Sequence, residues 1–364
     1  MKNEDRYVIS MSEAGGWDAL VQRFPDCTVF HTSPWLDSLA AVTGAKPLLL
    51  RATVDGDCVG VWPVLVLRKA VLRILGSPLP GWSTPYLGPL FAPEADVPAV
   101  LRAFLAHPAL RRHAFFACRV LDRRRPVDLG ALGFSQVTRF ETYRLSLTRD
   151  EEVLWSNLDP ECRRLVRKAQ KLGVVVSTEE DEGFMEPFWA MTVETFAKRG
   201  VAPAYSKELL LELWKRLHPV GGIEVCSAFL DGKRLGSQMM ALDGRAAYGI
   251  ALVSDQARIR EIPSNQILLW ETIRRVKAKG LEEFDFVSTL GGPGRFKRTF
   301  GPTAVHVATH WERCPNRLMR ELRTWYERYL HHQRKVPRTP HGGAPGRESQ
   351  GKTDPRSRDA SRTV

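Results

Sequence analysis

Apolar side chains recur at helical spacing in the second half of the chain. After Ser206, whose hydroxyl can cap a helix, they fall three or four residues apart, at Leu210, Leu213, Trp214 and Leu217. Similar patterns predict further helices over 160–172, 184–198, 265–280 and about 315–330. Runs rich in strand-forming residues predict strands over 223–230, 234–242, 246–253 and 283–288. This order of helices, antiparallel meander, helix and strand predicts a mixed α/β domain.

One short pattern occurs in both halves of the chain. Residues 54–60 (VDGDCVG) match residues 230–236 (LDGKRLG), and each copy lies between two β-rich runs. An Asp-Gly pair in that setting predicts a tight hairpin, because glycine accepts the positive φ that the turn needs. The repeat predicts two related domains, 1–150 and 151–330, each a central mixed sheet flanked by helices; a chance match is the alternative.

The distribution of charged residues predicts a basic tail and an anionic partner. The chain has 53 Lys and Arg against 41 Asp and Glu, a formal net charge of +12. Residues 331–364 are basic and rich in Gly, Pro and Ser, with almost no large apolar side chain, which predicts a disordered basic tail. The basic excess favours an anionic partner: a phosphate, a nucleic acid, or the head groups of a membrane contacted peripherally.

Cysteine usage and the charge-free stretches exclude several classes of protein. The six cysteines form no C-x-x-C pair, which argues against a disulfide frame or a zinc cluster and for a reducing compartment. The N-terminus has no apolar core and is not a secretory signal. The charge-free run 74–93 is broken by prolines and glycines, which predicts a structured apolar loop and no transmembrane segment. Its Trp82 and Tyr86 either line a substrate channel or belong to a packed connection in the first domain.

Two further motif matches are weak. Residues 346–353 fit the phosphate-binding P-loop pattern, but they lie in the predicted tail with no strand before them, so the match is attributed to chance. His306 and His310 fall in a segment that predicts a strand, and we expect them to be strand or core residues and not metal ligands.

Like charges crowd the predicted helix at 160–172. Cations spaced four residues apart repel one another slightly, so an anion should lie nearby. That anion is either the acidic stretch 179–182, together with solvent, or a phosphate-bearing substrate. The cations are Arg163, Arg164, Arg167, Lys168 and Lys171.

Residues 284–301 combine a strand with a glycine-rich segment. In a strand, Phe284 and Phe286 share one face, so Asp285 points the other way. The glycines that follow predict a loop carrying Arg295 and Lys297, and its flexible backbone would let an anionic ligand approach these cations. The alternative is a loop that only turns, with Phe296 and Phe300 as core residues.

The order of motifs over residues 17–312 resembles that of the FemAB-type peptidoglycan and polysaccharide acyltransferases, a branch of the GNAT superfamily. In the first half the motifs are VFHTSPWL at 29–36 and PYLGPL at 85–90. In the second half they are the basic stretch 164–173, F-x-K-R-G at 196–200, the hairpin at 230–236, a proline at 263, FDF at 284–286 and F-K-x-x-F-G at 296–301.

The resemblance implies a fold and an activity. It implies two GNAT-like domains in one chain and transfer of an acyl or aminoacyl group to an amine of a cell-wall or polysaccharide precursor in the cytoplasm. The donor is aminoacyl-tRNA in some members and acyl-CoA in others, with no tightly bound cofactor, and the acceptor is an anionic muropeptide or sugar precursor. Phe296 and Lys297 carry over as acceptor-cleft residues, and Tyr248 carries over from the central strand.

One departure from the pattern leaves the donor open. Acetyltransferases hold the CoA pyrophosphate on backbone N–H groups of a Q/R-x-x-G-x-G/A loop, whereas residues 256–261 here have no glycine and place Glu261 where it would repel phosphate. Arg258 and Arg260 are the candidate replacements for those donors. The chain also lacks the long coiled-coil arm of some tRNA-using members.

These residues suggest a mechanism and two rival functions. Lys297 would anchor an acceptor anion or stabilise charge at the tetrahedral centre, and Asp285 or Glu194 would take the amine proton. One rival is a non-catalytic protein that binds nucleic acid or another anionic ligand on an inherited transferase scaffold. The other is a CoA-dependent N-acyltransferase of sugar amines. The residues expected to contact the substrate are Arg295, Phe296, Tyr248, Arg164, Arg167, Lys168, Trp82 and Tyr86.

Overall fold

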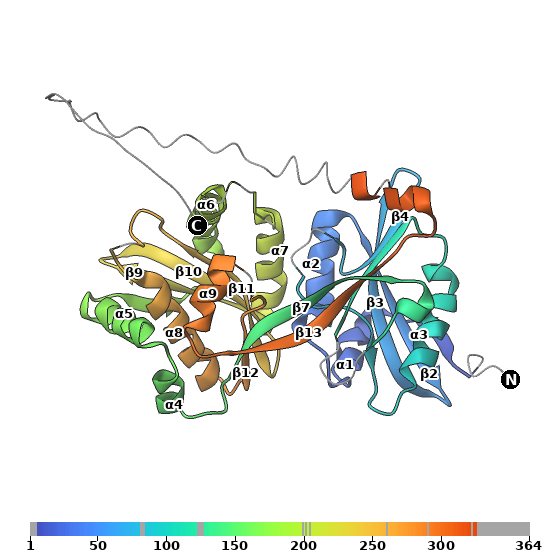
Figure 1. The fold of residues 1–364 in the computed structure, drawn as a ribbon, viewed down its shortest axis with the longest axis horizontal. Coiled ribbons are helices and arrows are strands. Elements are labelled where there is room, and N and C mark those ends of the chain that lie inside the picture. The colour runs from blue at the N-terminus through green and yellow to red at the C-terminus, as the bar shows by residue number, and fades with distance from the viewer. Residues whose placement is uncertain are drawn as a thin grey trace, which may run out of the picture.

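The computed structural model shows two lobes built on one long sheet (Figure 1). It describes residues 6–80, 84–121, 127–198, 200, 202–203, 205–259, 261–289, 291–321 and 323–325. The expected tail at 331–364, the P-loop match in it, Trp82 and Arg260 lie outside these residues.

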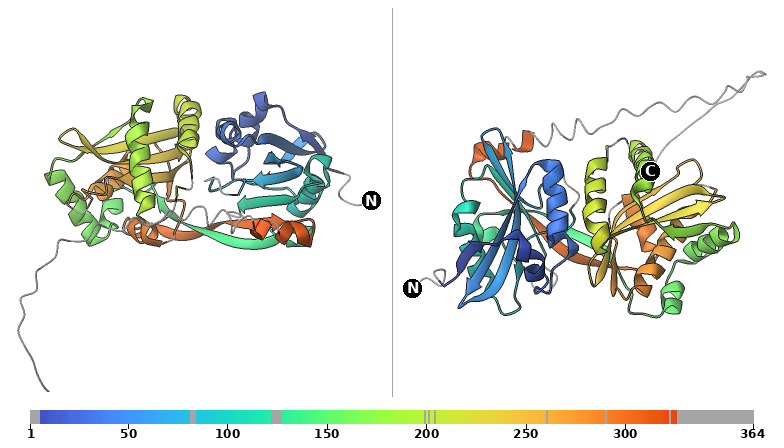
Figure 2. Two further views of the ribbon diagram at one scale, coloured as in Figure 1. Left: turned by 90° about the horizontal axis from the view of Figure 1, so that it is seen from above. Right: turned by 180° about the vertical axis from the view of Figure 1, so that it is seen from behind.

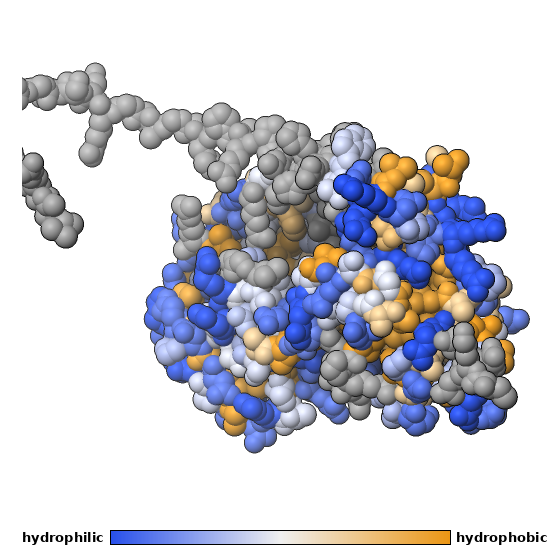
Figure 3. All heavy atoms as spheres, turned by 45° about the vertical axis from the view of Figure 1, so that its right-hand side comes forward, coloured by the Kyte–Doolittle hydropathy of each residue, from blue (hydrophilic) through white to orange (hydrophobic). Residues whose placement is uncertain are grey.

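The first lobe contains six strands and three helices within the described residues. Its strands are β1 (Val8–Met11), β2 (Lys46–Val54), β3 (Asp57–Lys69), β4 (Leu72–Ser77), β5 (Leu90–Phe91) and β6 (Phe115–Leu121). Its helices are α1 (Trp17–Val21), α2 (Ser33–Thr43) and α3 (Val97–Ala106). On the side shown in Figure 3, apolar patches on this lobe are separated by hydrophilic side chains.

The second lobe places helices on both faces of its strands. The strands are β8 (Val175–Thr178), β9 (Ile223–Leu230), β10 (Lys233–Leu242), β11 (Ala246–Ser254) and β12 (Glu283–Asp285). The helices are α4 (Glu151–Ser156), α5 (Pro160–Lys171), α6 (Met185–Ala197), α7 (Lys207–Leu217), α8 (Ser264–Ala278) and α9 (Gly291–Arg298). Short 3-10 turns in the two lobes cover Ala14–Gly16, Val29–His31, Pro108–Leu110, Gly130–Leu132, Glu182–Phe184 and His218–Val220.

Two long strands join the lobes. β7 (Ser135–Ser146) pairs with β12 and with β13 (Thr303–Arg313), and β13 pairs in turn with β6 of the first lobe. The sheet therefore runs β1-β2-β3-β4-β6-β13-β7-β12-β11-β10-β9-β8, with β5 added beside β3. Seen from above, β7 and β13 run side by side across both lobes (Figure 2). The expected boundary near residue 150 stays a prediction, and β13 returns from the later half to the earlier one.

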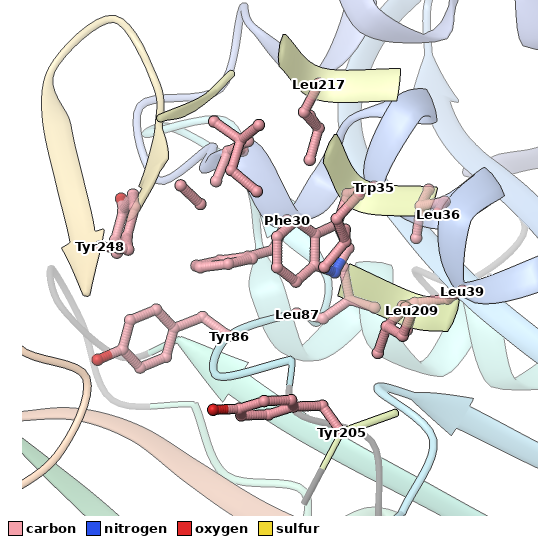
Figure 4. Close-up of a cluster of buried hydrophobic side chains, with 14 of the residues drawn as sticks. Phe30, Trp35, Leu36, Leu39, Tyr86, Leu87, Tyr205, Leu209, Leu217 and Tyr248 are labelled. Carbon is pink, nitrogen blue, oxygen red and sulfur yellow. The ribbon is translucent and has the colours of Figure 1, made fainter. Parts of the chain in front are cut away.

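The lobes are also joined by packing on one face of the sheet. Helix α2 of the first lobe packs against α7 of the second, and the Ser38 hydroxyl donates to the Glu212 carbonyl at 3.2 Å. An apolar cluster fills the space between the lobes, with Trp35, Leu36 and Leu39 meeting Leu209 and Leu217 (Figure 4). Burying these apolar side chains away from water stabilises the contact between the two lobes.

The capped helix α7 and the two hairpins form where the sequence predicts them. The Ser206 hydroxyl accepts a hydrogen bond from the Leu209 N–H at 3.2 Å and caps α7. Both Asp-Gly turns connect antiparallel strands, with φ of 50° at Asp55 and at Asp231. The mixed α/β class is confirmed.

The glycine-rich segment after β12 differs from the prediction. The expected strand over 283–288 ends at Asp285, and the expected loop over 291–298 is helix α9. Gly294 explains why this sequence can form a helix there, because a Cβ at that position would lie 1.9 Å from the Thr289 carbonyl oxygen. Glycine thus allows the first turn of α9 to pack against the chain that leads into it.

The run 74–93 and the two histidines, His306 and His310, lie in the part of the sheet that joins the lobes or next to it. Residues 74–77 of this run belong to β4 and residues 90–91 to β5, so the expected loop is limited to the residues between them, whose described part is mostly buried. None of the described helices combines the length and hydropathy needed to cross a bilayer. His306 and His310 lie in β13, and the described residues contain no cluster of three His, Cys, Asp or Glu side chains that could hold a metal ion.

Candidate functional site

A fully buried carboxylate lies where the two lobes meet. Asp285, the last residue of β12, has no exposed surface. It accepts hydrogen bonds from the Tyr86 hydroxyl at 3.1 and 3.2 Å, the Thr142 hydroxyl at 2.6 Å and the Arg144 Nε at 3.2 Å. Tyr86 comes from the first lobe, so this carboxylate ties the connection between β4 and β5 to the second lobe.

Strand β7 supplies two of these partners. Thr142 and Arg144 are two residues apart, so their side chains leave the same face of β7, and Arg144 is in register with Asp285. Sequence reasoning missed both residues, because it assigned no strand to 135–146. The signal was present, since Thr138, Phe140, Thr142 and Arg144 alternate with residues that point to the other face.

The turn after Asp285 has an unusual backbone. Val287 has φ of 65°, a conformation that β-branched residues rarely adopt. Its N–H donates to the Asp285 carboxylate at 2.7 Å, and this bond helps to hold the turn. Backbone strain of this kind persists only where surrounding contacts over-determine it, and it concentrates at functional sites.

Lys297 of α9 lies against this turn. Its Nζ donates to the Phe286 carbonyl oxygen at 2.6 Å. Burial lowers the pKa of Lys297 to about 8, and the attraction of Asp285 opposes that shift. The neighbouring Phe296 packs on Phe300 with ring centroids 5.4 Å apart, whereas Arg295 is exposed. The lysine predicted from the sequence is therefore held beside the buried carboxylate and not in bulk solvent.

Aromatic rings from both lobes cover the same region. Phe30 lies 4.9 Å from Tyr248 and 5.9 Å from Tyr86, measured between ring centroids (Figure 4). Tyr248 is in register with Asp285 on the neighbouring strand, and its hydroxyl donates to Asp243 at 2.8 Å. Two of the predicted substrate residues, Tyr86 and Tyr248, are thus brought together with Asp285.

Other predicted residues lie apart from this group. Glu194 is exposed on α6 and forms an ion pair with Lys198 at 3.5 Å. Arg258 lies 3.6 Å from Asp255 in the connection between β11 and α8. Neither Glu194 nor Arg258 forms a hydrogen bond with Asp285 or Lys297.

The basic helix α5 has its own set of partners. Arg164 pairs with Glu161 at 2.6 Å, Arg167 lies over the Trp155 ring at 5.3 Å, and the Lys168 Nζ donates to the Glu261 carbonyl at 3.0 Å. The acidic stretch 179–182 pairs elsewhere, with Glu179 on Arg234 and Glu182 on Lys215. The acidic stretch therefore does not neutralise α5.

A hollow of about 330 Å³ lies in the first lobe, away from these groups. Its lining includes Met11, Ser33, Asp37 and Leu48, from the segments around β1, α2 and β2. None of the predicted site residues lines it, so pocket size alone does not identify the site here.

Part of the chain matches a known protein family. Residues 158–298 match the family described as "Acetyltransferase (GNAT) domain". No curated protein sequence matches the chain. The matched segment contains α5, Asp285 and Lys297.

Several solved structures resemble the fold over most of their length. A crystal structure of FemX has a TM-score of 0.69 at 14% identity, covering 86% of this chain and 99% of that one. The L-PGS from Bacillus licheniformis has a TM-score of 0.54 at 8% identity, covering 90% and 98%. A tandem GNAT protein from the clavulanic acid biosynthesis pathway has a TM-score of 0.52 at 13% identity, covering 85% and 99%.

Proposed function

Residues 158–298 are a GNAT acetyltransferase domain within a FemAB-like tandem GNAT fold. From this premise we propose which group this N-acyltransferase transfers, from which donor and to which acceptor. It moves an acyl or aminoacyl group from acyl-CoA or aminoacyl-tRNA to an amine of an anionic cell-wall or polysaccharide precursor in the cytoplasm. The resemblance of its motifs to those of FemAB-type enzymes supports the acceptor class.

The observation that carries this proposal is the placement of Lys297. Its Nζ is fixed on the Phe286 carbonyl, beside Asp285, inside the segment that matches the acetyltransferase family. An acceptor amine attacks the thioester or ester carbon, a C–N bond forms, and the oxygen of the tetrahedral centre becomes negative. The Lys297 ammonium stabilises that oxygen. The C–S or C–O bond then breaks, and the thiol or hydroxyl leaves with the proton that the amine releases.

We assign Asp285 to positioning. Its two oxygens already accept bonds from Tyr86, Thr142, Arg144 and the Val287 N–H. The carboxylate fixes the turn that presents Lys297. Whether Asp285 or Glu194 also takes the amine proton stays a prediction.

Helix α5 supports an anionic donor site beside the connection that leads into α8. Lys168 and Lys198 both donate to carbonyls of that connection, those of Glu261 and Gln256. Lys168 of α5 and Lys198, which directly follows α6, thus add cations beside a segment that has no glycine. We therefore assign the predicted substrate contacts of Arg164, Arg167 and Lys168 to phosphate groups of the donor and not to the acceptor.

The decisive experiment assays the purified full-length chain with each donor separately. Acetyl-CoA is offered with amino-sugar acceptors and thiol release is followed; charged tRNA is offered with a nucleotide-linked muropeptide and the new amide is detected by mass spectrometry. Turnover with either donor supports the proposal. Tight tRNA binding with a steep salt dependence and no turnover with either donor would favour the non-catalytic alternative.

The first prediction concerns pH. In this mechanism Lys297 must be protonated to stabilise the tetrahedral oxygen. Because its pKa is about 8, turnover should fall as pH rises through about 8. In Lys297→Arg, whose guanidinium stays charged, the alkaline limb should move well upward even where the maximal rate is lower. A pH profile of turnover checks this, and an unchanged limb in the arginine variant would contradict it.

The second prediction concerns the donor. Lys168→Ala should raise the KM of the donor about fivefold, the equivalent of about 1 kcal/mol, and leave kcat nearly unchanged. Lys233→Ala, which removes an exposed lysine in the β9–β10 hairpin, is the matched control and should change neither value. Steady-state kinetics at two salt concentrations tests both, and equal KM values for the two variants would remove α5 from the donor site.

A further inference from the structure

Arg119 of β6 is a largely buried cation with an incomplete set of partners. Its Nη1 donates to the Thr84 carbonyl at 2.9 Å and to the Pro85 carbonyl at 2.7 Å. Within the part of the chain that the structure describes, it has no carboxylate partner. Buried arginine is normally paired with an anion, because taking a guanidinium out of water is costly.

The close approach of the Tyr86 loop explains why Arg119 is buried. Gly88 has φ of 154°, and a Cβ there would lie 2.6 Å from the Arg119 carbonyl oxygen. The loop therefore packs directly on β6 beside the arginine. Burial lowers the pKa of Arg119 to about 10.

One edge of the guanidinium is left without a partner. The Arg119 Nε is buried and has no hydrogen-bond partner, while Nη1 is occupied by the two carbonyls. The Nε–Nη2 edge is one of those by which arginine binds the two oxygens of a carboxylate or phosphate in parallel. Native proteins rarely leave a buried donor unsatisfied, so this edge is a candidate for binding an oxyanion.

A second unsatisfied polar atom lies on the neighbouring strand. His310 of β13 is in register with Arg119, and its buried Nδ1 has no hydrogen-bond partner, although its Nε2 lies 2.9 Å from Glu312. Both side chains contact Phe140: the guanidinium carbon lies 4.0 Å from the centroid of its ring, and the imidazole centroid lies 6.4 Å away. The two incomplete groups therefore flank one aromatic ring.

We propose that Arg119, with His310 and Phe140 beside it, binds an oxyanion, which is a carboxylate or phosphate group of the acceptor. Phe140 and Arg144 leave the same face of β7 four residues apart, which places them about 13 Å from each other. Arg144 contacts Asp285, so the oxyanion would bind on the order of 10 Å from the Arg144–Asp285 contact. Assigning the oxyanion to the acceptor rests on the proposed function, whereas anion binding itself does not.

Thermal unfolding of the full chain at constant ionic strength tests the site. Inorganic phosphate and acetate are titrated separately, since a ligand that binds only the folded state raises the unfolding midpoint in a saturable way. At least one should do so for the wild type, and the stronger of the two identifies the chemistry. Arg119→Lys keeps a cation for the Thr84 and Pro85 carbonyls but cannot bind an oxyanion with two nitrogens, so its apparent Kd should rise at least about tenfold.

Arg73→Lys is the matched control. Arg73 also holds a loop through two carbonyls, those of Ala109 and Arg111, and burial also lowers its pKa. Anion binding should be unchanged in this variant. If Arg119→Lys does not fold, His310→Gln, which replaces the incomplete imidazole, should weaken binding several-fold.

The proposal is overturned if neither anion stabilises the wild type saturably, or if the folded Arg119→Lys variant binds as tightly as the wild type. It is equally overturned if Arg119→Lys fails to fold and His310→Gln binds unchanged. Saturable binding that depends on Arg119, in a protein without transferase turnover, would leave the anion site standing and contradict the proposed function alone.

Discussion

Lys297→Met is expected to lower turnover by at least about 100-fold and at the same time to stabilise the fold. The rate falls because the variant loses the cation that stabilises the tetrahedral centre. The stability rises because burial lowers the pKa of Lys297 from 10.5 to about 8, so charging this side chain costs free energy in the folded state. At pH 7 we expect the free energy of unfolding to increase by about 1–3 kcal/mol. Turnover assays and urea unfolding measure the two effects.

The pH dependence of that stability identifies its cause. The folded state holds the Lys297 proton less tightly than the unfolded state, so between pH 8 and 10.5 the unfolded state binds more protons. Wild-type stability therefore gains from rising pH in this window, and the advantage of Lys297→Met should shrink between pH 7 and pH 10. The matched control is Lys277→Met, since the Lys277 Nζ also donates to a carbonyl, that of Leu147 at 2.8 Å. If the control loses as much turnover as Lys297→Met, no specific role can be given to Lys297.

Asp285→Asn is expected to destabilise the fold by about 3–5 kcal/mol and to remove most of the activity. The asparagine keeps the shape of the side chain but loses the charge opposite Arg144, and its amide group cannot accept every bond that the carboxylate accepts. The turn at Val287 would lose its anchor, and Lys297 would lose the fixed position of the Phe286 carbonyl. Urea unfolding at pH 7 measures the loss.

Two milder variants separate the parts of this network. Tyr86→Phe and Thr142→Val each remove one hydroxyl from Asp285 and should cost about 1–2 kcal/mol. Because Tyr86 comes from the first lobe, its loss should also weaken the contact between the lobes. If Asp285→Asn is no less stable than either single-hydroxyl variant, the carboxylate is not the anchor described here.

Local chemistry made much of the second lobe predictable. Ser206 caps α7 because a hydroxyl at that position can reach an N–H three residues later, and such a bond depends on no distant residue. Both Asp-Gly turns formed for the same reason. The error at 291–298 arose because glycines there predict a loop, whereas Gly294 is needed for close packing against Thr289.

The candidate site could be predicted only in part. The motifs indicated Lys297, Asp285, Tyr86 and Tyr248 separately, and their order along the chain indicated the fold family. No local pattern in the sequence predicts the hydrogen bond from Tyr86 to Asp285. Nor does one predict that Lys297, 11 residues after Phe286, donates to the Phe286 carbonyl. Arg119 could not be identified from the sequence, because its buried Nε without a hydrogen-bond partner is visible only in the folded structure.

The sequence by itself determined the elements whose stabilising contacts lie within a few residues: capped helices, tight hairpins and alternating strands. Only the tertiary structure decided that β13 lies between β6 and β7 and that Asp285 meets Thr142 and Arg144. The physical reason is that strand order depends on the collective burial of both sheet faces, and side chains far apart in the sequence become neighbours only once that order is formed.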